Sequence, residues 1–202
     1  QDNYLVDYTI WLPHLIHHQD QTTSIDLIIP IELSEYNKDL TAKALFNANC
    51  MLKTGSRRCI VYLASQEECN QYMSIAKEVF GTYHGCHLWI NKIDATVSKE
   101  NRKRVLKEFQ EGSDDIFHII TSVYILDEAV DIPQCDSEFI TIIGEKSSDI
   151  RMMQRSQRGS RIDKKRPHKH NHIFIWADGW EKCVNSLELL RNSDPDYHKK
   201  IR

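Results

Sequence analysis

The chain alternates between short apolar runs and longer amphipathic stretches, and this alternation constrains its fold more than any other feature. The apolar runs are nearly continuous and consist mostly of β-branched or aromatic residues: Cys59–Leu63, His87–Ile90, Ile116–Thr121, Phe139–Ile143 and His172–Trp176. Strands of a parallel sheet that is covered on both faces have this appearance. The runs therefore predict buried parallel strands.

Stretches with helical periodicity lie between these runs. The predicted helices cover Leu40–Leu52, Gln66–Phe80, Arg102–Phe109, Asp149–Gln157 and Trp180–Arg191. Ser65 precedes the second of them and Glu68 follows three residues later, which is the pattern of a capping box; Ser98 is expected to cap the third. Repeated strand–helix alternation predicts a three-layer α/β/α domain with a mainly parallel sheet.

The length of 202 residues suits a single domain. The N-terminal part fits the alternation less well, because Tyr8–Leu12 and Ile25–Leu33 read as two extended pieces joined by a polar excursion. We therefore expect an extended segment over 1–34 that packs on or enters the sheet, and one domain over 35–202. Since the first residue is Gln1, we expect the chain to be a piece of a longer or processed protein.

The composition excludes several classes of protein. A chain with 41% hydrophobic and 27% charged residues is neither disordered nor fibrous. No apolar run reaches the roughly 18–20 residues that a membrane span needs, so we expect no membrane partner and an intracellular protein. The six cysteines have neither CxxC nor zinc-like spacing, and we expect reduced, buried thiols. For His168-x-His170-x-His172 we favour a solvated polar loop over metal binding, and we expect no metal site.

The formal net charge of −3 hides an asymmetry. Residues 151–172 hold eight Lys or Arg and one acid, Asp163, a local charge of +7. Such a run is either a solvated face or an anion site. Within it, Gln154, Arg158 and Arg161 are spaced to share one face of a helical turn and its exit. Two guanidinium groups so placed can reach one phosphoryl group, because each is permanently charged and donates two hydrogen bonds.

Polar residues follow the predicted strands, at the ends where parallel sheets bind their ligands. In order and spacing, the segments over roughly 55–180 resemble the second RecA-like domain, the helicase C-terminal domain, of superfamily 2 helicases and translocases. Cys59–Ser65 resembles motif IV, Thr121–Pro133 motif V and Gln154–Arg161 motif VI. Ala95–Ser98, with the helix that follows and Gly112, resembles the segment ahead of motif V.

This resemblance implies a RecA-like fold and specific roles. Arg158 and Arg161 would be arginine fingers on ATP held by a first RecA-like domain, and Gln154 would orient the γ-phosphate side. Asp131 would contact the nucleotide ribose or the finger network, and Arg155 would contact the nucleotide. The backbone phosphates of a bound strand would be held by hydroxyl residues: Ser65, Thr96, Thr121 and Ser122. Two simpler roles stay open, namely Ser65 as a helix cap only and Asp131 as a turn residue.

Some positions depart from the family pattern. Gln157 stands where the family usually has Gly, and Asp127-Glu128 where many relatives have a small residue. Asp7-Tyr8-x-Ile10 and the residues of motif V are most similar to those of helicases of giant, nucleocytoplasmic large DNA viruses. A viral protein would be found in the virion or in the host cytoplasm or nucleus.

Two catalytic motifs of such motors are missing from the chain. It has no GxxxxGK[ST] phosphate loop and no DExx strand end. We therefore expect ATP and Mg²⁺ to bind only the full-length protein, and this chain alone to be inactive as an NTP hydrolase. The implied partners are the missing first RecA-like domain and single-stranded or duplex nucleic acid.

The leading prediction is therefore the C-terminal motor domain of an ATP-dependent nucleic-acid helicase or translocase. The alternative is a non-catalytic RecA-like module that binds nucleic acid or protein through its basic segment. A free-standing nucleotide-binding enzyme of flavodoxin-like topology is disfavoured, because no glycine-rich cradle follows any of the predicted strands.

Overall fold

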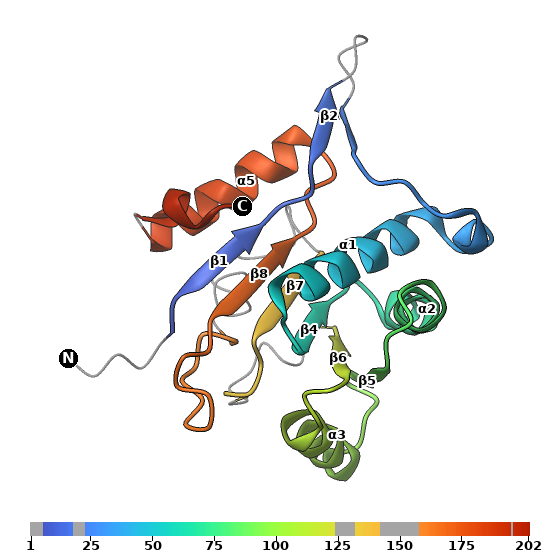
Figure 1. Cartoon of the computed structure of the whole chain (residues 1–202), viewed down its shortest axis with the longest axis vertical. Coiled ribbons are helices and arrows are strands. Elements are labelled where there is room, and N and C mark those ends of the chain that lie inside the picture. Colours follow the sequence, from blue (N-terminus) through green and yellow to red (C-terminus); the bar gives the residue numbers. More distant parts are fainter. Residues whose placement is uncertain (1–5, 18–22, 124–131, 142–157, 195) are drawn as a thin grey trace.

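A six-stranded sheet forms the centre of the computed structural model, which describes residues 6–17, 23–123, 132–141, 158–194 and 196–202 (Figure 1). The strand order is β1-β8-β7-β4-β6-β5, and every neighbouring pair is parallel. The strands are β1 Tyr8–Trp11, β4 Arg58–Tyr62, β5 Leu88–Ile93, β6 Phe117–Ser122, β7 Ser137–Ile140 and β8 Asn171–Ile175. The predicted α/β fold with a mainly parallel sheet is confirmed.

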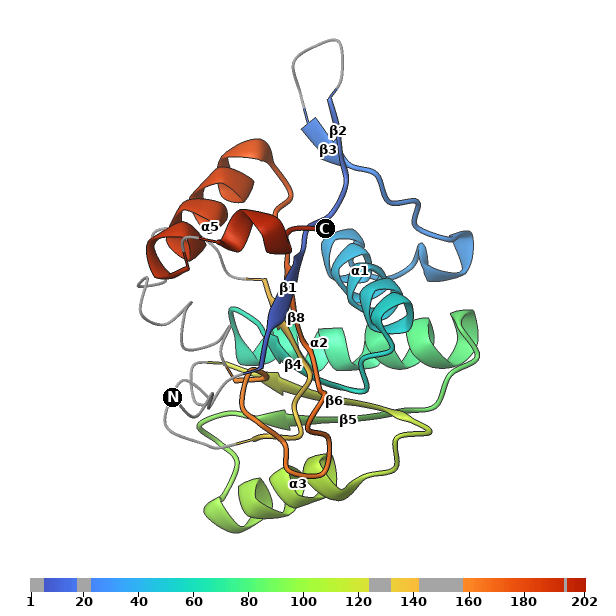
Figure 2. The ribbon, with the colours of Figure 1, turned by 60° about the vertical axis from the view of Figure 1, so that its left-hand side comes forward.

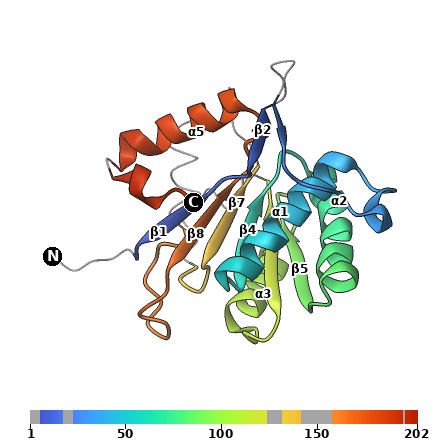
Figure 3. The same ribbon diagram turned by 45° about the horizontal axis from the view of Figure 1, so that its top comes forward.

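Helices α1 (Lys38–Thr54) and α2 (Gln66–Lys77) cover one face of the sheet, and a single π-helical segment, η2 (Glu78–Tyr83), continues α2 (Figure 3). Asn37 caps α1 by accepting a hydrogen bond from the Leu40 amide, and the helix ends at Gly55 in the left-handed region, with φ of +74°. The core on this face is aromatic and aliphatic, and includes Phe46, Met51, Val61, Tyr72, Phe80, Phe139 and Phe174.

The opposite face carries α3 (Lys99–Glu111) and α5 (Trp180–Ser193), and the short helix η4 (Tyr197–Lys200) follows α5. Figure 2 shows α5 and α1 on opposite sides of β1 and β8. The core on this side includes Ile60, Phe109, Ile120, Ile140 and Ile173. Both predicted caps are confirmed, since Ser65 and Ser98 accept from the amides of Glu68 and Asn101. The predicted helix Asp149–Gln157 lies outside the described residues.

The N-terminal part contributes β1 to the sheet and then a separate hairpin. β2 (Leu15–His17) and β3 (Thr23–Ile25) pair antiparallel and project beyond the sheet in Figure 1. The expected extended piece Ile25–Leu33 pairs as a strand only at Ile25, and it ends in a 3-10 turn, η1 (Ile31–Leu33), that follows Pro30. Proline has no amide to donate to a ladder, which favours an unpaired path here.

The cysteine thiols are mostly buried, as the sequence predicted. All six cysteines are free and five are buried. Within the part of the chain that the structure describes, no helix is both long enough and apolar enough to cross a membrane.

Candidate functional site

The four predicted hydroxyl residues gather at one edge of the sheet. Ser65 follows β4, Thr96 follows β5, and Thr121 and Ser122 end β6. These three strands are neighbours in the order β4-β6-β5, and parallel strands present their carboxyl ends at the same edge. The structure therefore brings the four residues to one side of the molecule, which we call the carboxyl edge.

Ser65 is engaged in capping and has acidic neighbours. Its Oγ accepts from the Glu68 amide at 3.1 Å, and Glu68 Oε2 accepts from the Ala64 amide at 2.7 Å. A cavity of about 310 Å³ beside it is also lined by Asp39 and Glu67. This capping box satisfies helix amides that would otherwise be available to an anion.

Thr96 is exposed and belongs to a small ionic cluster with Asp94 and Lys92. Oδ1 of the fully buried Asp94 accepts from the Thr96 amide at 2.8 Å and from its hydroxyl at 2.5 Å, and Lys92 Nζ lies 2.9 Å from Oδ2. Burial raises the pKa of Asp94, but the hydrogen bonds from Thr96 and Lys92 outweigh it and leave this pKa below its ordinary value. Sequence reasoning missed Asp94 and Lys92, although both flank the strand end.

Thr121 and Ser122 are fully buried and point to opposite faces of the sheet. Successive side chains of a strand alternate, so Thr121 shares a face with Ile119 and Ser122 with Ile120. Among the described residues, the Ser122 Oγ has no hydrogen-bond partner. The two adjacent hydroxyls therefore cannot face the same phosphate.

The two predicted arginine fingers lie at the opposite edge of the sheet, where the strands begin, which we call the amino edge. A turn closed by the Arg161 amide and the Arg158 carbonyl, 3.4 Å apart, carries both guanidinium groups. Ser160 in this turn accepts from the Val6 amide at 2.7 Å, next to the start of β1. The predicted contacts of Gln154, Arg155 and Asp131 lie outside the described residues, as do the departures at Asp127-Glu128 and Gln157.

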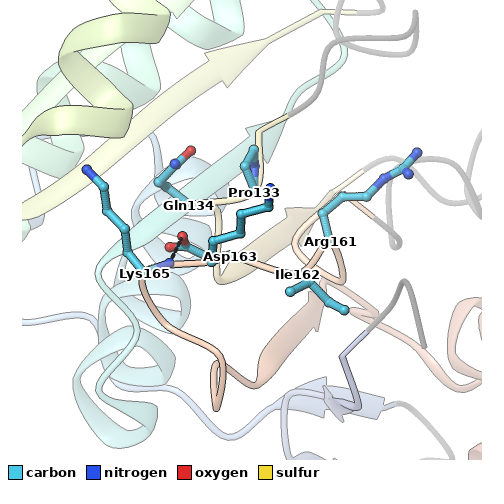
Figure 4. Close-up of a pocket in the computed structure, with 7 residues that line it drawn as sticks. Pro133, Gln134, Arg161, Ile162, Asp163 and Lys165 are labelled. Atoms are coloured by element: carbon cyan, nitrogen blue, oxygen red, sulfur yellow. Dashed lines mark hydrogen bonds between the residues drawn. The ribbon is translucent and has the colours of Figure 1, made fainter. Parts of the chain in front are cut away.

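A cavity of about 510 Å³ opens beside Arg161. Its walls combine cationic, amide and apolar side chains: Pro133, Gln134, Arg161, Ile162, Asp163, Lys164 and Lys165. Figure 4 shows Arg161 and Lys165 extending on either side of Asp163, whose carboxylate accepts from the Lys165 amide at 3.0 Å. Three cations around one cavity are a donor set suited to an anion such as a nucleotide phosphate.

Two cations of the basic run over 151–172, Arg166 and Lys169, contact acceptors of the protein itself. Arg166 lies 3.0 Å from the carboxylates of both Asp163 and Asp136. Asp136 also accepts from Ser56 Oγ at 2.7 Å and from the Arg58 amide at 2.9 Å. Lys169 Nζ donates to the carbonyls of Pro133 and Cys135 at 2.6 and 2.8 Å. Arg166 is thus neutralised by two carboxylates, Lys169 is hydrogen-bonded to carbonyl oxygens, and both fix the residues that precede β7.

Two of the three histidines expected in a solvated loop have protein partners, and His172 lies in β8 and is half-buried. His170 Nε2 lies 2.6 Å from Thr9 Oγ1, and Trp11 donates to His172 Nδ1 at 3.2 Å. Burial lowers the pKa of His172 to about 4. Within the described ranges, no group of three or more His, Cys, Asp or Glu residues is placed to hold a metal ion.

Residues 41–163 match the sequence model of the helicase conserved C-terminal domain. The chain belongs to this family. The matched range contains both the hydroxyl residues of the carboxyl edge and the arginine-bearing turn. No curated protein matches the chain by sequence.

Three solved structures illustrate the fold that this chain shares with known proteins. An ATP-dependent Type ISP restriction-modification enzyme, LlaBIII, bound to DNA, matches with a TM-score of 0.73 and 18% identity, over 96% of this chain and 14% of that one. A putative HsdR subunit fragment of a type I restriction enzyme from Vibrio vulnificus YJ016 matches with a TM-score of 0.62 and 17% identity, over 97% and 35%. The C-terminal domain of the DEAD-box protein Dbp5 matches with 0.55 and 13%, over 93% and 85%.

These likenesses show the fold, which is a RecA-like α/β fold that matches solved helicase C-terminal domains. The chain spans only about a seventh and a third of the first two proteins it matches.

Proposed function

We propose that the chain is the C-terminal motor domain of an ATP-dependent nucleic-acid helicase or translocase. The observation that carries this proposal is the separation of two polar sites on one rigid sheet. Hydroxyl residues occupy the carboxyl edge, and a turn with two arginines occupies the amino edge beside a cavity lined by three cations. A strand of five residues separates the edges by roughly 16 Å.

The amino edge is assigned to the nucleotide. ATP supplies the phosphoanhydride bond, and its remaining ligands, with those of Mg²⁺, belong to a first RecA-like domain. Arg158 and Arg161 donate to the phosphates and stabilise the negative charge that develops there. Gln154, Asp131 and Arg155 keep the roles that the motifs imply. Lys164, on the wall of the same cavity, adds positive charge.

The carboxyl edge is assigned to the phosphates of a nucleic-acid strand. Thr96 is exposed and lies beside a lysine, so we place the first contact there. Ser65, Thr121 and Ser122 remain assigned to the same strand by their motifs, although acids surround the first and burial covers the other two. Contacts of this type hold the backbone and carry no base information, which suits a motor that moves over any sequence.

The test is ATP hydrolysis by the full-length protein, measured without nucleic acid and with single-stranded DNA, duplex DNA or RNA. Arg158→Ala and Arg161→Ala are each expected to lower kcat by about 10³–10⁵, with the affinity for nucleic acid retained. Arg104→Ala is the matched control, because this exposed arginine of α3 pairs with Glu108 across one helical turn, at 2.7 Å. Full hydrolysis by the Arg158→Ala protein would exclude the finger assignment.

The alternative of a non-catalytic binding module has its own signature. It predicts nucleic-acid or protein binding without any ATP hydrolysis by the wild-type full-length protein. The resemblance to helicases of large DNA viruses concerns the origin of the protein and stays a prediction.

A further inference from the structure

Side chains of the sheet contact the turn that carries the two arginines. Gly159 and Ser160 are buried, whereas Arg161 is exposed. The rest of the domain therefore packs against the two residues between the arginines. Whatever fixes Gly159 and Ser160 also fixes the points from which both guanidinium groups extend.

Glu138 contacts the first of these two residues. It lies in the middle of β7, is fully buried, and pairs in register with Ile60 and Ile173 on either side. A carboxyl group in such an apolar layer is costly unless it is hydrogen-bonded. Its Oε1 accepts from the Gly159 amide.

Asn171 contacts both residues. It is the first residue of β8 and is fully buried. Its Nδ2 donates to Ser160 Oγ at 3.1 Å. A Cβ atom at position 159 would overlap Asn171 Oδ1 and would lie 2.9 Å from Glu138 Oε1, so only glycine fits there. At position 159 the turn thus lies too close to β7 and β8 to admit a side chain.

We propose that Glu138 and Asn171 are positioning residues, which hold the Arg158–Arg161 turn in the geometry that hydrolysis requires. This inference rests on the proposed function, because it assumes that the two arginines act on ATP. Both residues act only through Gly159 and Ser160. Their effect is therefore expected in the chemical step and in neither substrate affinity nor nucleic-acid affinity.

The experiment compares kcat and KM for ATP in the full-length protein. Glu138→Val removes the acceptor of the Gly159 amide, and Asn171→Ala removes the donor to Ser160 Oγ. A misplacement of the arginines by about 1 Å can lower the rate about 10²-fold. We expect kcat to fall by about that factor, with KM nearly unchanged. Glu138→Gln keeps the shape and an acceptor for the Gly159 amide, and should restore most of the rate.

Ser137→Ala is the matched control. Ser137 adjoins Glu138 on β7 and is equally buried, but it points to the other face, where it contacts Ser56 Oγ at 2.5 Å. If Glu138→Val does not fold, Ser160→Ala deletes a single oxygen and carries the same expectation for kcat. Folded Glu138→Val or Ser160→Ala protein with kcat within about twofold of wild type would overturn the proposal, given the expected 10²-fold effect.

Hydrogen exchange of the Gly159 amide separates this proposal from the proposed function. Loss of the Glu138 acceptor should speed this exchange, and Glu138→Gln should slow it again, whatever reaction the protein catalyses. Unaltered exchange in Glu138→Val would refute the hydrogen bond between the Gly159 amide and Glu138. Accelerated exchange together with an active Arg158→Ala protein would instead refute the finger assignment.

Discussion

The buried carboxyl of Glu138 should make the stability of the domain depend on pH in an unusual direction. Burial raises the pKa of Glu138 to about 8, and the hydrogen bonds from Gly159 and Asn171 and the charge of Lys169 only partly offset it, while Asp136 adds to the rise. The folded domain therefore binds the proton more tightly than the unfolded chain, where the pKa is near 4.5. Stability from this group is complete below 4.5 and is lost as the pH rises towards 8.

The size of the effect follows from the two pKa values. Each tenfold change in proton affinity corresponds to about 1.4 kcal/mol. The rise from 4.5 to about 8 therefore corresponds to about 5 kcal/mol of unfolding free energy. Domains of this size are typically stable by about 5–15 kcal/mol, so the loss is a large fraction of the total.

The assay is urea denaturation of the wild type and of Glu138→Gln at intervals across this window. His172 acts in the opposite direction between 4 and 6.5, because burial lowers its pKa to about 4, so the useful quantity is the difference between the two proteins. The advantage of the wild type over Glu138→Gln should shrink steadily as the pH rises to 8. A constant difference across the window would refute the reasoning, because it would mean that Glu138 titrates alike in the folded and unfolded states.

Three further changes test other parts of the structure. Gly159→Ala should destabilise the domain by about 1–3 kcal/mol in chemical denaturation, because its Cβ overlaps Asn171. Unchanged stability would mean that Asn171 does not pack closely against the turn. Arg166→Met should cost about 3–5 kcal/mol, since it leaves the buried carboxylate of Asp136 without its cation, and a thermal midpoint equal to that of the wild type would contradict this. Ser65→Ala should cost about 1 kcal/mol through loss of the α2 cap, and Ser65→Asp should restore it.

The order of strands and helices was largely readable from the sequence. Buried parallel strands leave continuous apolar runs, and both predicted serine caps combine a hydroxyl with a downstream amide that lies close in sequence. The start of β7 was not found, because Glu138 interrupts the apolar run and the predicted strand began at Phe139. A buried acid becomes plausible only once its partner Gly159, 21 residues away, is known.

The candidate sites were only partly readable, for the same reason. The basic run showed how much positive charge is present, but not which acceptors each cation contacts. Arg166 and Lys169 find acceptors in the segment before β7, 30 and 36 residues earlier. The alternation of a strand already implied that Thr121 and Ser122 face opposite ways. The acidic surroundings of Ser65 depend on Asp39, which only the folded chain brings near.

The position of β1 has a consequence for how the chain is synthesised. β1 pairs with β8, and the register joins Tyr8 to Asn171 and Trp11 to Phe174. The first strand of this domain to leave the ribosome must therefore wait for the last one before its backbone finds a partner. An unpaired strand edge invites association with other chains, and such distant pairings form slowly. Until β8 is made, β1 therefore presents an unpaired strand edge on the nascent domain.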